Sequence, residues 1–215
     1  MKKKVVQDLA VSILIISILL FLNINIPYIK IIFCGLIVLI YTSLTGGLKN
    51  RLGFKTPKSW INVSMLGLSL GLFIVSLAYF ILVPLITNLT GDALLIGSFQ
   101  QIKGNTAVLY TSLAIGWVIG GFFEEVIFRG FLLGSILEIK DNIWIKIGGV
   151  LFTSIIFGYL HSYQGLTGQI TLSITGIFLG LIFIFNKRSI WLNIITHGLI
   201  NTVSMLIIYT GLIDV

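Results

Sequence analysis

Two glutamates and an arginine interrupt a long apolar stretch in the segment Gly121-Phe-Phe-Glu-Glu-Val-Ile-Phe-Arg129. Each charge near the centre of a bilayer costs at least ~2.5–3.5 kcal/mol, so such a group needs compensation. Glu125 and Arg129 stand four residues apart with the acid first, which predicts an ion pair within one helix. Glu124 has Phe128 at that spacing, so its carboxylate is a candidate general base. A protonated Glu124 that hydrogen-bonds a neighbouring helix is the alternative.

The chain has only two histidines, and each has a companion four residues away, Phe157 before His161 and Asn201 after His197. A spacing of four puts each pair on one face of a helix. A single buried histidine is usually a packing residue. Two histidines together with an acidic pair in an otherwise apolar chain indicate a functional site.

The depth of these residues in a bilayer can be compared by counting ~1.5 Å per residue from the ends of the predicted spans. Glu124, His161 and Asn201 then lie about 21–22 Å deep, and His197 about 15 Å. We therefore expect the four side chains to share one layer. His161 comes close to the end of its apolar run, which predicts that one rim of the site is wet.

Two chemistries fit this set of residues. In the first, Glu124 takes a proton from water, His161 orients that water, and His197 and Asn201 donate hydrogen bonds to the oxyanion of a tetrahedral intermediate. In the second, Glu124, His161 and His197 bind zinc, which activates the water. The compact H-E-x-x-H zinc motif is absent. We favour the first chemistry and expect no cofactor, with zinc as the alternative.

The composition indicates that the elements that position these residues are membrane helices. The chain has 215 residues, of which 57% are hydrophobic and 10% charged, against roughly 25% charged in soluble domains. The formal net charge of +7 comes from lysines and arginines scattered in loops, which argues against a nucleic-acid partner. We predict one membrane-embedded, all-α transmembrane helix bundle. Its seven apolar runs are 5–25, 28–46, 60–87, 106–138, 146–161, 168–186 and 190–212.

The basic residues predict how this bundle is oriented. Lys30 and Lys103 fall on one side of the predicted bundle. The other side has the larger group: Lys2, Lys3, Lys4, Lys49, Arg51, Lys55, Lys58, Lys140, Lys146, Lys187 and Arg188. Because cytoplasmic loops hold most of the Lys and Arg, we expect a cytoplasmic N-terminus and an external C-terminus.

Three smaller features are interpreted as structural. The basic start followed by Val5–Leu22 lacks a small-residue cleavage site, so we expect a retained helix and not a signal peptide. Cys34 is the only cysteine, which excludes an intrachain disulfide and favours core packing. Glycine pairs spaced by four predict close helix packing at Gly67 and Gly71, Gly116 and Gly120, and Gly176 and Gly180.

Three motifs occur in order on separate spans: E-E-x-x-x-R, F-x-x-x-H and H-x-x-x-N. Together they resemble the CPBP family, which comprises type II CAAX prenyl endopeptidases and bacterial bacteriocin-processing or Abi proteins. The resemblance covers about residues 106–212. It implies a catalytic core over 106–215, preceded by transmembrane helices over 1–105 that have no recognised motif.

The resemblance further implies an integral-membrane endopeptidase of the glutamate type. Its candidate catalytic residues are Glu124, Glu125, His161, His197 and Asn201. Arg129 and Phe157 would support them. Glu124 would be the base that activates water, with His161 beside it, and His197 and Asn201 would form the oxyanion site.

The expected partners are the lipid bilayer and a membrane-associated peptide or protein substrate in a bacterial cell membrane. Maturation of a pheromone or bacteriocin, self-immunity to a bacteriocin, and trimming of a membrane-anchored peptide are all consistent with such an enzyme. A non-catalytic immunity or scaffold protein is the alternative. A proton or cation carrier would be expected to contain inverted repeats, and the ionisable residues of the site all lie in one half of the chain.

Overall fold

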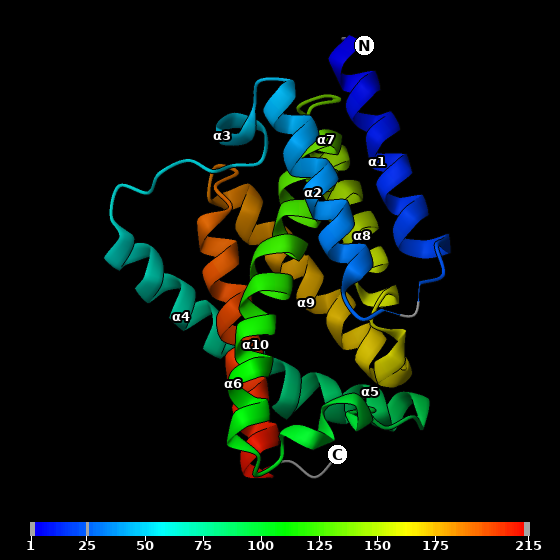
Figure 1. Ribbon diagram of the computed structural model, residues 1–215, viewed down its shortest axis with the longest axis vertical. Helices are drawn as coiled ribbons and strands as arrows, with labels where there is room; N and C mark the ends of the chain where they lie inside the picture. Colours follow the sequence, from blue (N-terminus) through cyan, green and yellow to red (C-terminus); the bar gives the residue numbers. More distant parts are fainter. Residues whose placement is uncertain (1–2, 25, 213–215) are drawn as a thin grey trace.

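The structure is a computed structural model that describes residues 3–24 and 26–212, and all regular structure within these ranges is helical (Figure 1). The α-helices are α1 (Lys3–Phe21), α2 (Ile29–Leu44), α3 (Leu48–Arg51), α4 (Trp60–Leu77), α5 (Val83–Thr90), α6 (Thr106–Ile115), α7 (Gly134–Leu137), α8 (Ile143–Tyr159), α9 (Gly165–Phe185) and α10 (Trp191–Thr210). The π-helices are η1 (Ala78–Leu82), η3 (Gly116–Glu124) and η4 (Val126–Leu133), and the 3-10 helices are η2 (Gly97–Ile102) and η5 (Ser162–Gln164). The predicted all-α bundle is confirmed.

The helices match the predicted spans. Five of them are long and apolar enough to cross a membrane: Lys3–Phe21, Trp60–Thr90, Thr106–Leu137, Ser162–Phe185 and Trp191–Thr210. Ile29–Leu44 and Ile143–Tyr159 are apolar but shorter. Each predicted apolar run overlaps one of these helices, and residues 91–105 add only the short helix η2. The chain is an integral membrane protein.

The two ends of the bundle differ in charge. Figure 1 shows the N-terminus at one end and the C-terminus at the other. The end that contains the start of α1, α3 and the turns after α7 and α9 is here called the N-terminal face. Most of the predicted larger basic group belongs to these elements and to the loop after α3, whereas Lys2 lies outside the described residues. Lys30, at the start of α2, and Lys103, just after η2, lie toward the opposite end.

Polar caps fix where several helices begin. The side chains of Ser59, Asn105 and Asn142 accept hydrogen bonds from backbone N–H groups in the first turns of α4, α6 and α8, at 3.2, 3.2 and 2.7 Å. Such side chains satisfy N–H groups that a helix leaves unpaired at its start. Two of these helices, α6 and α8, lead directly to predicted site residues.

Small residues bring the helices close together. All three predicted glycine pairs face a neighbouring helix: Gly67 and Gly71, Gly116 and Gly120, Gly176 and Gly180. A Cβ atom on Gly71 would lie 3.1 Å from the Thr196 carbonyl oxygen of α10. A Cβ atom on Gly176 would lie 3.1 Å from the Ser154 Cα atom of α8. The prediction of close packing is confirmed.

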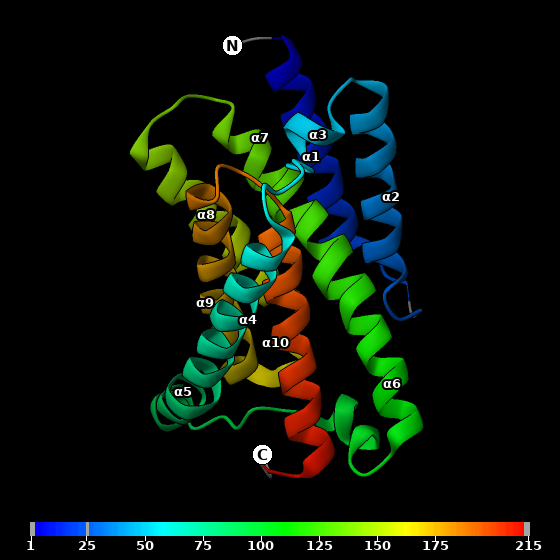
Figure 2. The same ribbon diagram turned by 90° about the vertical axis from the view of Figure 1, so that its left-hand side faces the viewer.

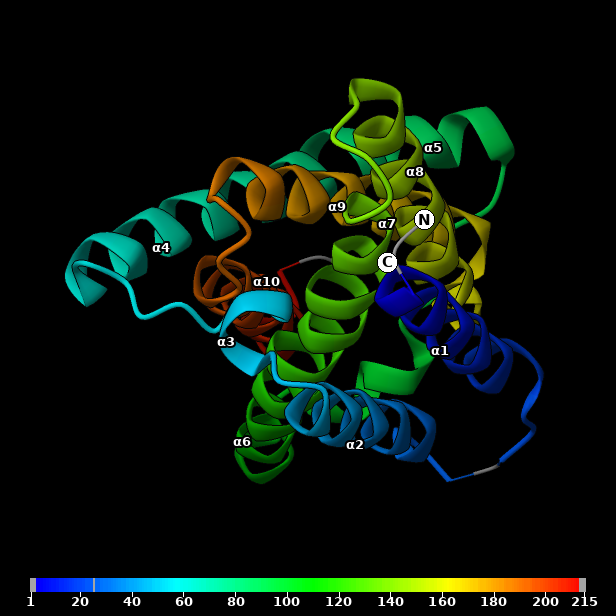
Figure 3. The same cartoon turned by 90° about the horizontal axis from the view of Figure 1, so that it is seen from above.

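Helix α10 lies inside the bundle and contacts α4, α6, η3 and α9. The view from above in Figure 3 shows it between α4 and α6, and Figure 2 shows α4 and α5 running beside α9 and α10. Asn193 fixes α10 to α9, since its Nδ2 atom donates to the Leu179 carbonyl at 2.7 Å. The helix that contains His197 and Asn201 is therefore held on several sides.

An ion-pair network joins the first three helices at the N-terminal face. Asp8 of α1 is buried, pairs with Arg51 of α3, and accepts a hydrogen bond from the Tyr41 hydroxyl of α2 at 2.7 Å. The Arg51 guanidinium also bonds to Thr45 and lies 5.2 Å from the centroid of the Tyr41 ring. We call Asp8, Tyr41, Thr45 and Arg51 the N-terminal network.

Candidate active site

The acidic pair lies in wide helical turns. Residues 106–137 form one continuous span, in which Glu124 ends the π-helix η3 and Glu125 precedes the π-helix η4. A π-helix has i→i+5 hydrogen bonds, is rare, and occurs frequently at functional sites. Here two of them meet at the pair of glutamates. The sequence predicted a helix around the two glutamates but did not predict the π-helical turns on either side of them.

The predicted ion pair is present and buried. Arg129 Nη1 lies 2.9 Å from Glu125 Oε1, and the two side chains are 2% and 0% exposed. Arg129 Nη2 donates a second hydrogen bond to the Gly176 carbonyl of α9 at 3.2 Å, and the guanidinium lies 4.7 Å from the centroid of the Phe157 ring. A buried charge without a partner is strongly destabilising, so the loss of either Glu125 or Arg129 alone would destabilise the fold.

His197 of α10 binds the same oxygen. Its Nδ1 atom lies 2.7 Å from Glu125 Oε1. An ionised carboxylate only accepts hydrogen bonds, so Nδ1 is the protonated nitrogen. This bond orients the ring and places Nε2 3.8 Å from Glu124 Oε2. We call Glu125, Arg129 and His197 the interior network. It joins the span 106–137 to α10, a contact that residue spacing within one helix could not predict.

Glu124 stands next to this network without belonging to it. Its side chain is 12% exposed, and within the described parts of the chain its carboxylate has no hydrogen-bond partner. His197 Nε2, at 3.8 Å, is close but beyond hydrogen-bond distance. The spacing argument, which gave Glu124 no partner in its own helix, agrees with this geometry.

His161 lies in a turn and not in a helix, which corrects the prediction that it stands within a span. Helix α8 ends at Tyr159, and His161 precedes the short helix η5. His161 Nδ1 lies 2.7 Å from the carbonyl oxygen of Phe157. The last carbonyls of a helix lack partners within it, and the imidazole satisfies one of them. The side chain is half-buried, in keeping with the expected wet rim.

Phe157 separates the two histidines. The centroid of its ring is 4.7 Å from that of His161 and 5.9 Å from that of His197. No group of three His, Cys, Asp or Glu within the described ranges is arranged to hold a metal ion. The alternative zinc ligands, which included both histidines and Glu124, therefore do not fit a shared metal in this geometry, and we derive no step through one.

Asn201 lies one helical turn after His197 on α10. Its Nδ2 atom donates to the Gly116 carbonyl of η3 at 3.0 Å. Gly120 makes this approach feasible, because a Cβ atom there would lie 2.3 Å from Asn201 Nδ2 and 3.3 Å from His197 Nε2. Sequence reasoning treated Gly120 as a packing residue only. Its spacing from Glu124, four residues, is the one feature that could have placed it at the site.

The structure thus brings Glu124, Glu125, His197 and Asn201 together from two helices. His161 is connected to them through the ring of Phe157. This arrangement offers two imidazoles, a carboxamide and one carboxylate, Glu124, that has no hydrogen-bond partner among the described residues, with one ion pair that neutralises the second carboxylate. These groups can accept a proton from water and donate hydrogen bonds to a developing oxyanion.

A comparison with family models finds one match in the C-terminal half of the chain. The family described as type II CAAX prenyl endopeptidase Rce1-like matches residues 106–203. The matched Rce1-like stretch contains all the candidate residues, from Glu124 to Asn201, and confirms the family resemblance. It supports a membrane peptidase of the CAAX-protease type. Searches of curated proteins and of solved structures found no match.

Proposed function

We propose that this protein is an intramembrane endopeptidase in which Glu124 activates the water that cleaves a peptide bond. One observation carries the proposal. The Glu124 carboxylate has no hydrogen-bond partner within the described parts of the chain, while the charge of Glu125 beside it is offset by Arg129 and shared with His197. The family match adds independent support for peptide hydrolysis.

In the first step, a water molecule would bind between Glu124, whose side chain is 12% exposed, and the half-buried His161. Glu124 accepts a proton from this water, and His161 orients it through the ring nitrogen that does not bind the Phe157 carbonyl. The water oxygen bonds to the carbonyl carbon of the substrate. The electron pair of the C=O bond moves to the carbonyl oxygen.

His197 and Asn201 stabilise the resulting oxyanion. Asn201 uses one N–H for the Gly116 carbonyl and keeps a second one for the substrate. His197 binds Glu125 through Nδ1, so it donates to the oxyanion from Nε2, which requires the doubly protonated ring. Two carboxylates flank this ring, at 2.7 and 3.8 Å. Loss of one such donor typically reduces the rate ~10²–10³-fold.

In the last step the intermediate collapses. Glu124 returns its proton to the amide nitrogen of the substrate, the C–N bond breaks, and the amine leaves. The carbonyl oxygen re-forms its double bond, and the other product is a carboxylic acid. Glu124 is again a carboxylate, so the cycle uses one water and no other reactant.

This mechanism uses no metal. We expect activity to persist after dialysis against a chelator, and elemental analysis of the active protein to give less than one equivalent of zinc. Loss of activity on chelation, followed by recovery with added zinc, would contradict the metal-free mechanism.

We further propose that the substrate is a membrane-associated peptide or protein in a bacterial cell membrane. The interior network is buried in a bundle of apolar helices, so a substrate reaches it from the membrane or its edge. Most basic residues gather at the N-terminal face, which we assign to the cytoplasm. Maturation of a secreted peptide and defence against a bacteriocin are both consistent with this substrate class.

The test compares peptide termini in membranes with wild-type protein and with Glu124→Gln, using mass spectrometry. Wild-type protein is expected to generate new termini that are absent with the variant. Asp92→Asn is the matched control, because it makes the same carboxylate-to-amide change at an exposed residue outside the site. Identical termini with wild-type protein and Glu124→Gln would instead support the non-catalytic scaffold.

A further inference from the structure

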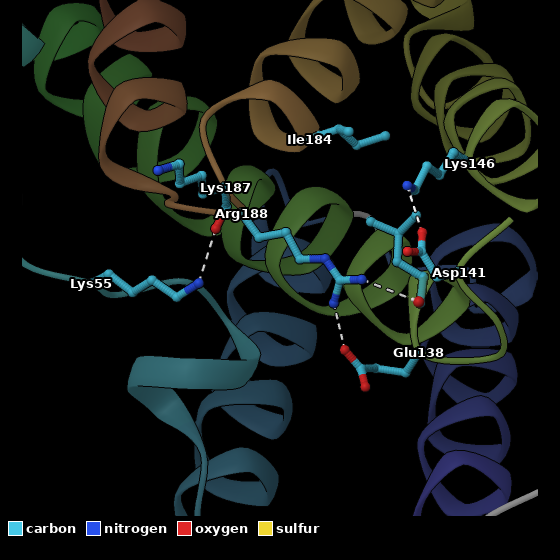
Figure 4. A pocket seen from close by; sticks show the side chains of 8 residues that line it. Lys55, Glu138, Asp141, Lys146, Ile184, Lys187 and Arg188 are labelled. Carbon is cyan, nitrogen blue, oxygen red and sulfur yellow. Dashed lines mark hydrogen bonds and ion pairs between the residues drawn. The ribbon is translucent and has the colours of Figure 1, made fainter. Parts of the chain in front are cut away.

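A charged hollow lies at the N-terminal face, apart from the candidate active site. Its volume is about 590 Å³, and it is a shallow, open depression bordered by the loop after α3, the turn between α7 and α8, and the turn between α9 and α10 (Figure 4). Its polar lining consists of four basic and two acidic side chains: Lys55, Lys146, Lys187, Arg188, Glu138 and Asp141. None of these residues has a role in the proposed hydrolysis.

The carboxylates neutralise only part of this charge. Arg188 pairs with Glu138, and Lys146 Nζ lies 2.6 Å from Asp141 Oδ1. The hydrogen bond from Lys146 lowers the pKa of Asp141, so this carboxyl stays ionised at neutral pH and offsets the lysine.

Lys55 and Lys187 remain without a carboxylate partner among the residues that the structure describes. Lys55 Nζ donates to the Lys187 carbonyl oxygen at 2.9 Å, which fixes its position but leaves its charge. The lining therefore has a net positive charge. The Lys55 ammonium lies at the rim of the hollow, and the Lys187 side chain extends from the same rim in Figure 4, from where it can turn toward an anion.

The turn that forms one wall has an unusual backbone. Lys187 and Arg188 have φ values of 52° and 58°, the left-handed region that residues with a Cβ atom seldom adopt. Backbone hydrogen bonds hold this turn: Arg188 N–H donates to the Phe183 carbonyl at 2.9 Å, and Ile190 N–H to the Gly53 carbonyl at 3.0 Å. Figure 4 shows the Arg188 side chain crossing the hollow toward Glu138. Such backbone outliers persist where the surroundings enforce them, frequently at binding sites.

The hollow also has an apolar part. Ile184 and Leu137 line it, and they belong to the last turns of α9 and α7, where these helices approach the N-terminal face. A ligand there would meet ammonium groups on one side and the ends of membrane helices on the other. Basic pockets between membrane helices on one side of a bilayer are suited to anionic head groups.

We propose that this hollow binds a phosphate-bearing anion, with Lys55 and Lys187 as its principal contacts. The phosphodiester of an anionic phospholipid head group fits the combination of charge and apolar wall. Free inorganic phosphate has the same charged group without the apolar body, and experiment distinguishes the two sources.

The test measures the thermal unfolding temperature of the full-length protein in neutral detergent during titration with one added compound. The three compounds are short-chain phosphatidylglycerol, phosphatidylcholine of equal chain length, and inorganic phosphate. Phosphatidylglycerol is expected to raise the unfolding temperature more than phosphatidylcholine does. The double variant Lys55→Gln/Lys187→Gln is expected to bind phosphatidylglycerol roughly tenfold more weakly.

The control double variant is Lys58→Gln/Lys140→Gln, which removes the same charge from exposed residues of the same face outside the hollow. It is expected to bind as wild-type protein does, and so is Lys55→Arg/Lys187→Arg, which keeps both charges. Lys187→Gln alone leaves the Lys187 carbonyl and its bond to Lys55 in place, and it tests the site if the double variant fails to fold.

Stabilisation by inorganic phosphate equal to that by phosphatidylglycerol, and lost in the same variant, would identify free phosphate as the source. An equal loss in both glutamine double variants would overturn the proposal, because general surface charge would then explain binding. No preference for phosphatidylglycerol or phosphate over phosphatidylcholine would overturn it as well.

Discussion

Two carboxylate–arginine pairs occupy opposite environments in this protein. Asp8 and Arg51 pair in the N-terminal network at one end of the bundle, where Arg51 is 13% exposed, whereas Glu125 and Arg129 pair in the bundle interior, where Arg129 is 2% exposed. In both, the guanidinium lies over an aromatic ring, with distances to the centroid of 5.2 and 4.7 Å. The two pairs thus use the same contacts to stabilise a charge.

The difference lies in what stands beside each pair. The N-terminal network adds a tyrosine and a threonine, which complete its hydrogen bonds and tie three helices together. The interior network adds His197, and next to it stands Glu124 with an unused carboxylate. In both networks the ion pair stabilises the packing of neighbouring helices. The spare acid and the imidazole beside it are what make one place suited to catalysis.

The largest effect is expected for Glu124→Gln. Removal of the general base should lower the cleavage rate by ~10²–10⁴-fold. The unfolding temperature should stay close to that of wild-type protein, because Glu124 makes no hydrogen bond within the described residues. Rates from purified protein in vesicles and a parallel thermal melt check this. A large fall in both quantities would make Glu124 a structural residue.

Arg129→Met should mainly reduce stability. It leaves the Glu125 carboxylate buried without its cation, which costs about 3–5 kcal/mol in the free energy of unfolding. Unfolding in mixed micelles measures this loss. The double variant Glu125→Gln/Arg129→Met should regain most of it, since no charge is then left alone. A stable single variant would contradict the compensating role of the pair.

Gly120→Ala should lower activity by ~10–100-fold, since a displaced catalytic group loses about this much. The added methyl would meet the Asn201 amide at 2.3 Å and must push it aside. Gly148→Ala is the matched control, because nothing lies within 4 Å of a Cβ atom at that position. Equal activities for the two variants would contradict the proposed role of Asn201 in the oxyanion site.

Asp8→Asn should have the smallest effect. It removes the carboxylate that Arg51 and Tyr41 bind, at an expected cost of about 1–2 kcal/mol in the free energy of unfolding. The cleavage rate per folded molecule should not change. Thermal melts and rates normalised to folded protein check this. A specific loss of activity would show that the N-terminal network also serves catalysis.

Much of the site could be predicted because its pattern lies within single helices. The four-residue spacing identified the pair of Glu125 and Arg129 and left Glu124 without a partner. The bond between His197 and Glu125 could not be predicted, because spacing along one helix does not determine how another helix is rotated against it. The wide turns around Glu124 also have no residue signature that separates them from α-helical turns.

His161 illustrates the limit of periodicity. Its four-residue spacing from Phe157 is compatible with a continuing helix, and the helix instead ends at Tyr159. The chain then reverses through Gly165, whose φ of 75° is readily adopted only by glycine. That ending places Phe157 between the two histidines, an arrangement that only the folded geometry reveals.

Helix α10 lies against Gly67 and Gly71 of α4, which come from the half of the chain without a recognised motif. A side chain at Gly67 would press on Ile195, two residues before His197. The family match begins at residue 106, whereas these packing contacts come from residues before it. Substitutions at these two glycines would therefore displace α10 and disturb the proposed active site, although neither glycine contacts a candidate catalytic residue.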